Sequence, residues 1–145
     1  MNIENGLGPD MAMLECVSFL LVHENRFLVE RRRLDKAGDP GAVAIPGGHL
    51  EAGEGPIDAL HRELDEELGV TAGRAEFFCT LLHRSDAVRK LHYYAVPDWS
   101  GEIQNNEAEA VFWLTFAQAD QLDLTVDRTA IGEYLRVVAY QASKS

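Results

Sequence analysis

Residues 48–70 read GHLEAGEGPIDALHRELDEELGV, a glycine-rich loop that leads into an acidic and amphipathic segment. Pro56 suits the first position of a helix, because the N–H that proline lacks would have no partner there. The apolar residues that follow recur at the spacing of one helix face: Ile57, Leu60, Leu64 and Leu68. Gly69 is well placed to end the helix. The stretch therefore predicts a helix over 56–68 whose apolar stripe packs against the rest of the protein.

The segments on either side of this stretch predict β-strands. Residues 14–22 are apolar and β-branched, and residues 26–31 alternate after a polar turn, so the two segments form a predicted hairpin. A loop over 33–42 precedes a short buried strand at 43–45, which Pro46 and the following glycines break. Three further strands are expected beyond the helix, at 75–82, 91–96 and 110–114.

Two more helices are expected near the end of the chain. Thr115 is a candidate cap for a short helix, FAQADQL, and Asp127 is a candidate cap for a longer one. The longer helix would pack apolar residues at helical spacing: Ile131, Tyr134, Leu135 and Val138. Strands before, between and after helices indicate an α/β or α+β layered fold. The 145 residues suit a single domain over 1–145, with polar, glycine-rich residues 1–11 as a loose terminus.

The composition is that of a globular protein, with 46% hydrophobic and 26% charged residues, which excludes disordered and fibrous classes. The formal net charge is -11, and the 23 residues of 48–70 hold -6 of it. A bare acidic surface repels nucleic acid and anionic membranes, so we expect neither as a stable partner. So many like charges in one short segment are destabilising unless something positive is bound there.

The cysteines and the apolar runs favour a cytoplasmic location. Cys16 and Cys79 have apolar neighbours and are too few for a disulfide framework, so they are interpreted as small core residues in a reducing compartment. The longest apolar run, residues 17–22, is too short to span a bilayer. The first ten residues lack the basic region and apolar core of a signal peptide.

The acidic helix contains a potential metal site. Glu66 and Glu67 follow Glu63 by three and four residues, so Glu63 and Glu67 flank the apolar stripe one turn apart and Glu66 lies farther round the helix. Like charges at this spacing destabilise a helix, and a hard divalent cation with oxygen ligands removes that penalty. The alternative is a glutamate-rich face that is simply solvated.

The full pattern favours the metal site. Gly48, five residues, Glu54, seven residues and then 62–70 (RELDEELGV) resemble the Nudix box, Gly-x5-Glu-x7-Arg-Glu-U-x-Glu-Glu-x-Gly-U with U aliphatic. Every specified position matches. Outside the box the resemblance to Nudix hydrolases of the MutT-like type is one of layout. It implies an α/β/α sandwich with a mixed central sheet and a loop-helix-loop catalytic motif.

The resemblance also implies which residues act. Glu63, Glu66, Glu67 and the Gly48 carbonyl would bind Mg²⁺, with Mn²⁺ as a substitute. Arg62 and Glu54 would order the loop against the helix.

The implied chemistry is attack of water on a phosphorus of a diphosphate linkage, after which a carboxylate takes the proton. Glu66 is our first choice for that base. Glu107 and Glu109 are candidates for a metal ligand or base, or are merely solvent-exposed loop acids.

The substrate expectation is a nucleotide. Arg31 or Arg32 could bind a phosphate, although arginines there could equally form a solvated hairpin edge. His49 lies within the box at a variable position and could approach the substrate. The stretch PGGHLE (46–51) resembles members that convert nucleoside triphosphates to monophosphate and pyrophosphate. ADP-ribose or sugar nucleotides are the alternative substrates, and a non-catalytic nucleotide-binding module is a further alternative. A monomer and a homodimer are equally compatible with the sequence.

Overall fold

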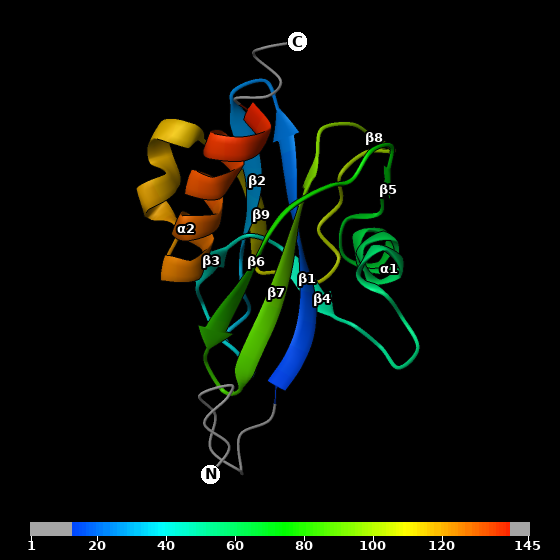
Figure 1. Ribbon diagram of the computed structural model, residues 1–145, viewed down its shortest axis with the longest axis vertical. Helices are drawn as coiled ribbons and strands as arrows, with labels where there is room; N and C mark the ends of the chain where they lie inside the picture. The colour runs from blue at the N-terminus through cyan, green and yellow to red at the C-terminus, as the bar shows by residue number, and fades with distance from the viewer. Residues whose placement is uncertain (1–12, 140–145) are drawn as a thin grey trace.

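The computed structural model describes residues 13–139, which form one mixed sheet between helical layers (Figure 1). The expected loose terminus at 1–11 lies outside these residues. The sheet order is β3-β2-β1-β7-β6, with β4 paired to β1 and β9 paired to β2. The strands of this sheet are β1 (Met13–His23), β2 (Arg26–Arg31), β3 (Val43–Ala44), β4 (Gly47–His49), β6 (Glu76–Arg84), β7 (Val88–Val96) and β9 (Ala110–Thr115).

Strand pairing opens the sheet at one end. β1 and β2 form the predicted hairpin, but they pair only at Val22–Phe27 and His23–Arg26, next to the turn. Farther from the turn, β1 pairs with β4 and, in parallel, with β7, whereas β2 pairs with β3 and β9. The two strands therefore diverge, and the sheet is mixed, as expected. A small second sheet, β5 (Thr71–Ala72) with β8 (Trp99–Ser100), was not predicted.

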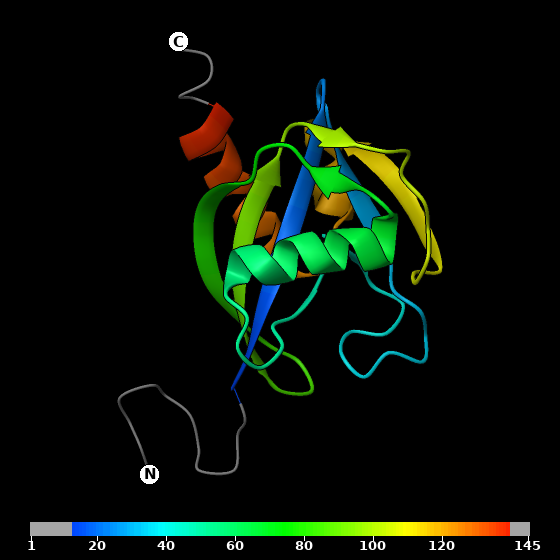
Figure 2. The same ribbon diagram turned by 90° about the vertical axis from the view of Figure 1, so that its right-hand side faces the viewer.

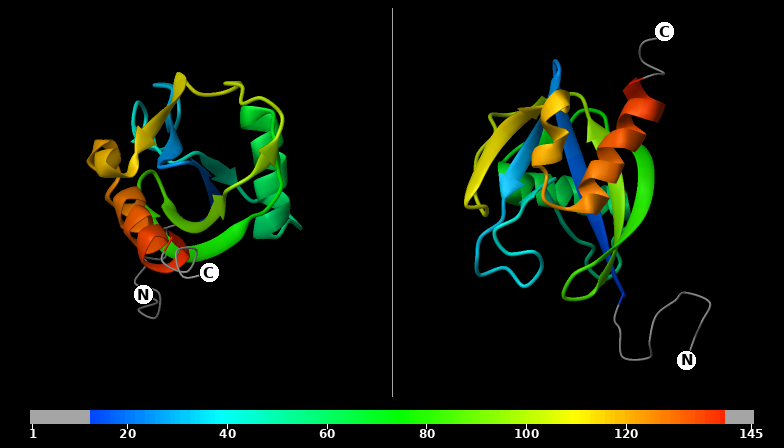
Figure 3. Two further views of the ribbon diagram at one scale, coloured as in Figure 1. Left: turned by 90° about the horizontal axis from the view of Figure 1, so that it is seen from above. Right: turned by 90° about the vertical axis from the view of Figure 1, so that its left-hand side faces the viewer.

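Helices cover both faces of the sheet (Figures 2 and 3). Helix α1 (Pro56–Leu68) lies on one face, and α2 (Thr125–Tyr134) lies on the other, with the short helices η1 (Phe116–Gln121) and η2 (Leu135–Ala139). Because side chains alternate along a strand, β1 serves two cores. Phe19 packs in the core beneath α1 and Leu20 in the core beneath α2. The α/β/α sandwich expected from the sequence is confirmed.

Helix α1 has the predicted bounds but a different buried face. Leu60, Leu64 and Leu68 are buried as expected, and Gly69 ends the helix with φ 68°. Ile57, however, is 42% exposed. Ala59 is buried instead, because it lies on the same side of the helix as Glu63, Leu60 and Leu64.

Two sequence-based expectations about caps and strands are wrong. Asp127 does not cap α2, which begins at Thr125 after Leu124; the Asp127 side chain lies in the interior, bonded to other elements. The strand at 43–45 was expected to be followed by a break, yet Gly47–His49 forms β4. The Phe19 N–H donates to the Pro46 carbonyl at 2.9 Å, so β1 draws the chain back into the sheet directly after the proline.

Among the described residues, no helix is long and apolar enough to cross a membrane.

Candidate active site

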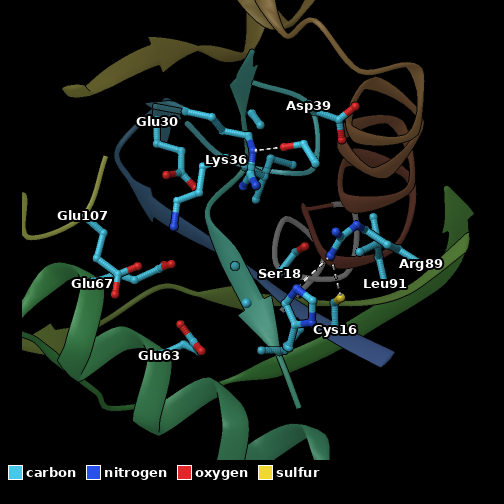
Figure 4. Close-up of a pocket in the computed structure, with 18 of the residues that line it drawn as sticks. Cys16, Ser18, Glu30, Lys36, Asp39, Glu63, Glu67, Arg89, Leu91 and Glu107 are labelled. Atoms are coloured by element: carbon cyan, nitrogen blue, oxygen red, sulfur yellow. Dashed lines mark hydrogen bonds between the residues drawn. The ribbon is translucent and has the colours of Figure 1, made fainter. Parts of the chain in front are cut away.

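A cavity of about 400 Å³ lies where β1 and β2 diverge. Its lining includes Cys16 and Ser18 of β1, Glu30 of β2, Gly48 of β4 and Glu67 of α1. Figure 4 shows these elements around a common space, with carboxylates on the α1 side. The volume falls in the range of small-molecule sites.

Arg62 joins the glycine-rich loop to helix α1. Its guanidinium donates to both Glu54 oxygens, at 2.7 and 2.9 Å, and to the His49 carbonyl at 2.8 Å. It also donates to Glu63 at 2.7 Å and to Glu66 at 3.2 Å. These hydrogen bonds from Arg62 lower the pKa of Glu54 to about 2. Arg62 thus links the loop, at Glu54 and His49, to helix α1.

Gly48 lets the loop approach the helix closely. A Cβ atom at this position would overlap the Glu63 carboxylate, so with any other residue here the Glu63 side chain would have to move. Glu63 is 9% exposed, and burial raises the pKa of its carboxyl although Arg62 opposes the shift. The Gly48 backbone and a buried carboxylate thus face the same corner of the cavity.

Glu67 and Glu30 are the least compensated charges of the site. One oxygen of each carboxyl is buried without a hydrogen-bond partner. Burial, and then the charges of Glu30, Glu63 and Glu107, raise the pKa of Glu67 to about 10. Burial also raises the pKa of Glu30 to about 7. Uncompensated carboxylates in a cavity are a feature of functional sites.

The donor set fits a hard divalent cation. Within residues 13–139, no three His, Cys, Asp or Glu side chains stand close enough to hold an ion as they are arranged here. Arg62 accounts for this in part, because it binds Glu63 and Glu66. The unpartnered oxygens of Glu67 and Glu30 are oxygen ligands of the kind that Mg²⁺ prefers, and a cation would compensate their charge.

The predicted substrate-binding residues separate into two groups. Arg32, His49 and Glu107 line the cavity. Arg32 Nε donates to the Gly38 carbonyl at 2.8 Å, which fixes the guanidinium on the cavity wall. Arg31 and Glu109 instead line a neighbouring cavity of about 450 Å³.

Several cavity residues were not anticipated. Arg89 of β7 lies 2.9 Å from His49 Nε2 and 2.7 Å from Asp86, and Lys36 enters from the loop after β2 (Figure 4). Glu30 could have been found, because strand alternation in RFLVER places it in phase with Leu28, which packs beneath α1. Nothing local in the sequence points to Arg89, since only the sheet order brings β7 to the cavity.

Comparison with known proteins supports the resemblance to the Nudix box. The model of the NUDIX domain matches residues 15–134. A CTP pyrophosphohydrolase of Escherichia coli (strain K12) is 31% identical over 115 residues, which cover 79% of this chain and 84% of that protein. An 8-oxo-dGTP diphosphatase of Haemophilus influenzae is 28% identical over 106 residues, 72% of this chain and 78% of that protein.

Solved structures show the same fold. The E. coli ORF135 protein superposes with a TM-score of 0.75 at 27% identity, over 93% of this chain and 97% of that one. A MutT Nudix hydrolase from Burkholderia pseudomallei gives a TM-score of 0.74 at 25% identity, over 84% and 98%. With an intact box whose loop and helix form one wall of a carboxylate-lined cavity, the chain belongs to the Nudix hydrolase family.

Proposed function

We propose that the protein hydrolyses a diphosphate linkage of a nucleoside triphosphate and releases a nucleoside monophosphate and pyrophosphate. One observation carries the proposal: a single cavity contains the box carboxylates on one wall and the cationic side chains of Arg32, Lys36 and Arg89 on the others. Carboxylates there can hold a cation, and the cationic groups can bind phosphate. The relatives that act on CTP and on 8-oxo-dGTP support a triphosphate substrate.

The proposed cofactor is Mg²⁺, with Mn²⁺ as a substitute. Glu63, Glu66, Glu67 and the Gly48 carbonyl would hold it, since all four residues line the cavity. When bound, such an ion neutralises phosphate oxygens and lowers the pKa of the attacking water. Glu54 does not compete for this role, because both of its oxygens accept hydrogen bonds from Arg62.

Side chains of the cavity would orient the substrate. Arg32 is fixed by Gly38 and can present its remaining N–H groups to a phosphate. Lys36 lines the cavity, so its ammonium can bind a second phosphate oxygen. Leu91 and Leu124 also line the cavity, and they provide apolar surface against which a nucleobase could pack.

Two carboxylates are placed to take the proton from water. Glu66 lines the cavity and has one oxygen on Arg62, so its other oxygen can either bind the cation or take the proton. Glu107 lines the cavity from the loop before β9 and faces Glu67 (Figure 4). Replacing the true base by glutamine should lower kcat by about 10²–10⁴-fold. It should also remove the fall of kcat at low pH that titration of the base causes. Glutamine at the other position should leave that fall in place.

The test of the proposed function is a product analysis. Nucleoside triphosphates, 8-oxo-dGTP, dinucleoside polyphosphates, ADP-ribose and nucleotide sugars are incubated with Mg²⁺, and the products are identified by mass. We expect monophosphate and pyrophosphate from one or more triphosphates. Hydrolysis of only ADP-ribose or nucleotide sugars would replace the triphosphate assignment. Nucleotide binding without any phosphate release would identify a binding module instead.

A further inference from the structure

Glu30 is an unusual residue for the middle of a sheet. It lies on β2 between two partner strands, opposite Ala44 of β3 and Val111 of β9. Its side chain is on the α1 face, and the residue is 7% exposed. One carboxyl oxygen has no hydrogen-bond partner, yet the side chain lines the cavity. A buried polar group without a partner is costly, so its retention at this position calls for a ligand.

The surroundings of Glu30 indicate which ligand. Across the cavity from Glu30 stand the carboxyls of Glu67 and Glu107, which lie beside each other (Figure 4). The charges of Arg32 and Lys36, which line the same cavity, partly offset that of Glu30, but burial outweighs them. Three carboxyls that face one another across a cavity repel unless a cation lies between them.

We propose that Glu30 is a metal-binding carboxylate. Together with Glu67 and Glu107 it binds a divalent cation on the sheet side of the cavity, and the three side chains turn toward the ion from the arrangement seen here, in which no three carboxyls of residues 13–139 are close enough to hold one. This ion is additional to one on the loop side, at Gly48, Glu63 and Glu66, and Glu67 is shared between the two. All three side chains provide the oxygen ligands that Mg²⁺ and Mn²⁺ accept, and the open cavity leaves room for water and phosphate oxygens. The inference rests on the proposed use of divalent cations, but not on the identity of the nucleotide.

The experiment is a Mn²⁺ titration of the full chain, with free Mn²⁺ followed by electron paramagnetic resonance and heat by calorimetry. The variants are Glu30→Gln and, as a matched control, Glu109→Gln, whose carboxylate is exposed and lines the neighbouring cavity. We expect Glu30→Gln to lose one Mn²⁺ equivalent or to weaken one site by about tenfold or more. The metal-induced rise in Tm should shrink in the same variant. Glu109→Gln should behave as the wild type.

Equal Mn²⁺ isotherms for the wild type and a folded Glu30→Gln variant would overturn the inference. An unchanged isotherm with an altered preference among nucleobases would also overturn it, and would make Glu30 a base-recognition residue. If Glu30→Gln does not fold, Glu30→Asp decides, since it keeps a carboxylate one methylene farther back. The inference requires that variant to retain both Mn²⁺ ions, one of them more weakly, and an undiminished isotherm contradicts it.

The two proposals fail separately. A wild type that binds two Mn²⁺ ions, and loses one in Glu30→Gln, but hydrolyses no nucleotide supports the metal site and rejects the proposed function. A wild type that hydrolyses triphosphates, with an isotherm that Glu30→Gln leaves unchanged, supports the function and rejects the role of Glu30.

Discussion

At the scale of single residues, Glu67 is a carboxylate whose surroundings disfavour its charge. Its carboxyl lies near those of Glu30, Glu63 and Glu107, and one of its oxygens has no partner. Such a group is destabilising in the free protein and useful only when it binds something. The helix could have carried a leucine or alanine here at lower cost, so the carboxylate is best explained by function.

We predict that Glu67→Gln lowers kcat by at least about 100-fold, because a ligand to the cation is lost. The metal-free variant should be at least as stable as the wild type, since glutamine carries no charge to bury. Steady-state hydrolysis and urea unfolding test both statements. Asp65→Asn is the control, because Asp65 lies on the same helix but is exposed and outside the cavity. Undiminished turnover in Glu67→Gln would exclude this carboxylate from the metal site.

Asp127 is a second buried carboxyl, with a structural role. It is 2% exposed and accepts hydrogen bonds from Ile45 N at 3.0 Å and from the Tyr93 hydroxyl at 2.7 Å. It therefore ties α2 to the chain just before β4 and to β7. Burial raises the pKa of Asp127 to about 6, despite these hydrogen bonds.

This pKa predicts a pH dependence of stability. Between the unfolded pKa of 3.8 and the folded value of about 6, the native state binds a proton that the unfolded state releases. The contribution of Asp127 is therefore complete below pH 3.8 and is lost as pH rises through about 6, by up to about 3 kcal/mol. Urea unfolding of the wild type and Asp127→Asn at a series of pH values tests this. As pH falls from 7 to 4, the free energy of unfolding of the wild type should rise relative to that of Asp127→Asn. A difference that stays constant with pH would contradict the assignment.

At the scale of elements, the placement of the loop and of α1 depends on two adjacent glycines, Gly47 and Gly48, which contact different neighbours. Gly48 leaves room for the Glu63 carboxylate, whereas a Cβ at Gly47 would overlap the Val17 carbonyl of β1. A side chain can rotate away, but the backbone of a central strand cannot. Gly47 therefore determines how β4 joins the sheet, and through β4 it positions the whole loop.

We predict that Gly47→Ala destabilises the fold by roughly 1–3 kcal/mol, because β4 must separate from β1. Gly132→Ala is the matched control: Gly132 lies in α2, and a Cβ there meets no atom within 4 Å. That change should raise the free energy of unfolding by about 0.5–1 kcal/mol, since alanine favours the helix. Thermal unfolding of both variants measures the difference. Equal stability of Gly47→Ala and the wild type would show that β4 tolerates displacement.

The accuracy of the sequence-based prediction differs between elements. Helix α1 was predicted from Pro56 to Leu68 because its start, stripe and end are all encoded locally. The hairpin of β1 and β2 was predicted for the same reason. β4 was missed, because consecutive glycines disfavour a strand and only the pairing with β1 makes one. β5 and β8 are two residues long and leave no periodic pattern.

At the scale of the whole molecule, the cavity results from pairings that no local pattern encodes. The parallel pairing of β1 with β7 and the early separation of β1 from β2 bring Arg89, Glu30 and the box helix around one space. The box residues could be named by their resemblance to the family pattern, since that pattern is contiguous in the sequence. Residues from distant strands could not, because their proximity depends on sheet order. Glu107 and Glu109 show where prediction from local sequence ends: they are two residues apart, yet they line different cavities.

The arrangement as a whole predicts one reaction, which a single assay can observe. The protein is incubated separately with CTP and with 8-oxo-dGTP in water enriched in ¹⁸O, with Mg²⁺ or with excess chelator. All products are then identified by mass spectrometry. We predict nucleoside monophosphate and pyrophosphate from at least one of the two, with ¹⁸O in only one product and no turnover in chelator. Nucleoside diphosphate and phosphate as products, or equal turnover in chelator, would contradict the assignment of the cavity as a metal-dependent pyrophosphohydrolase site.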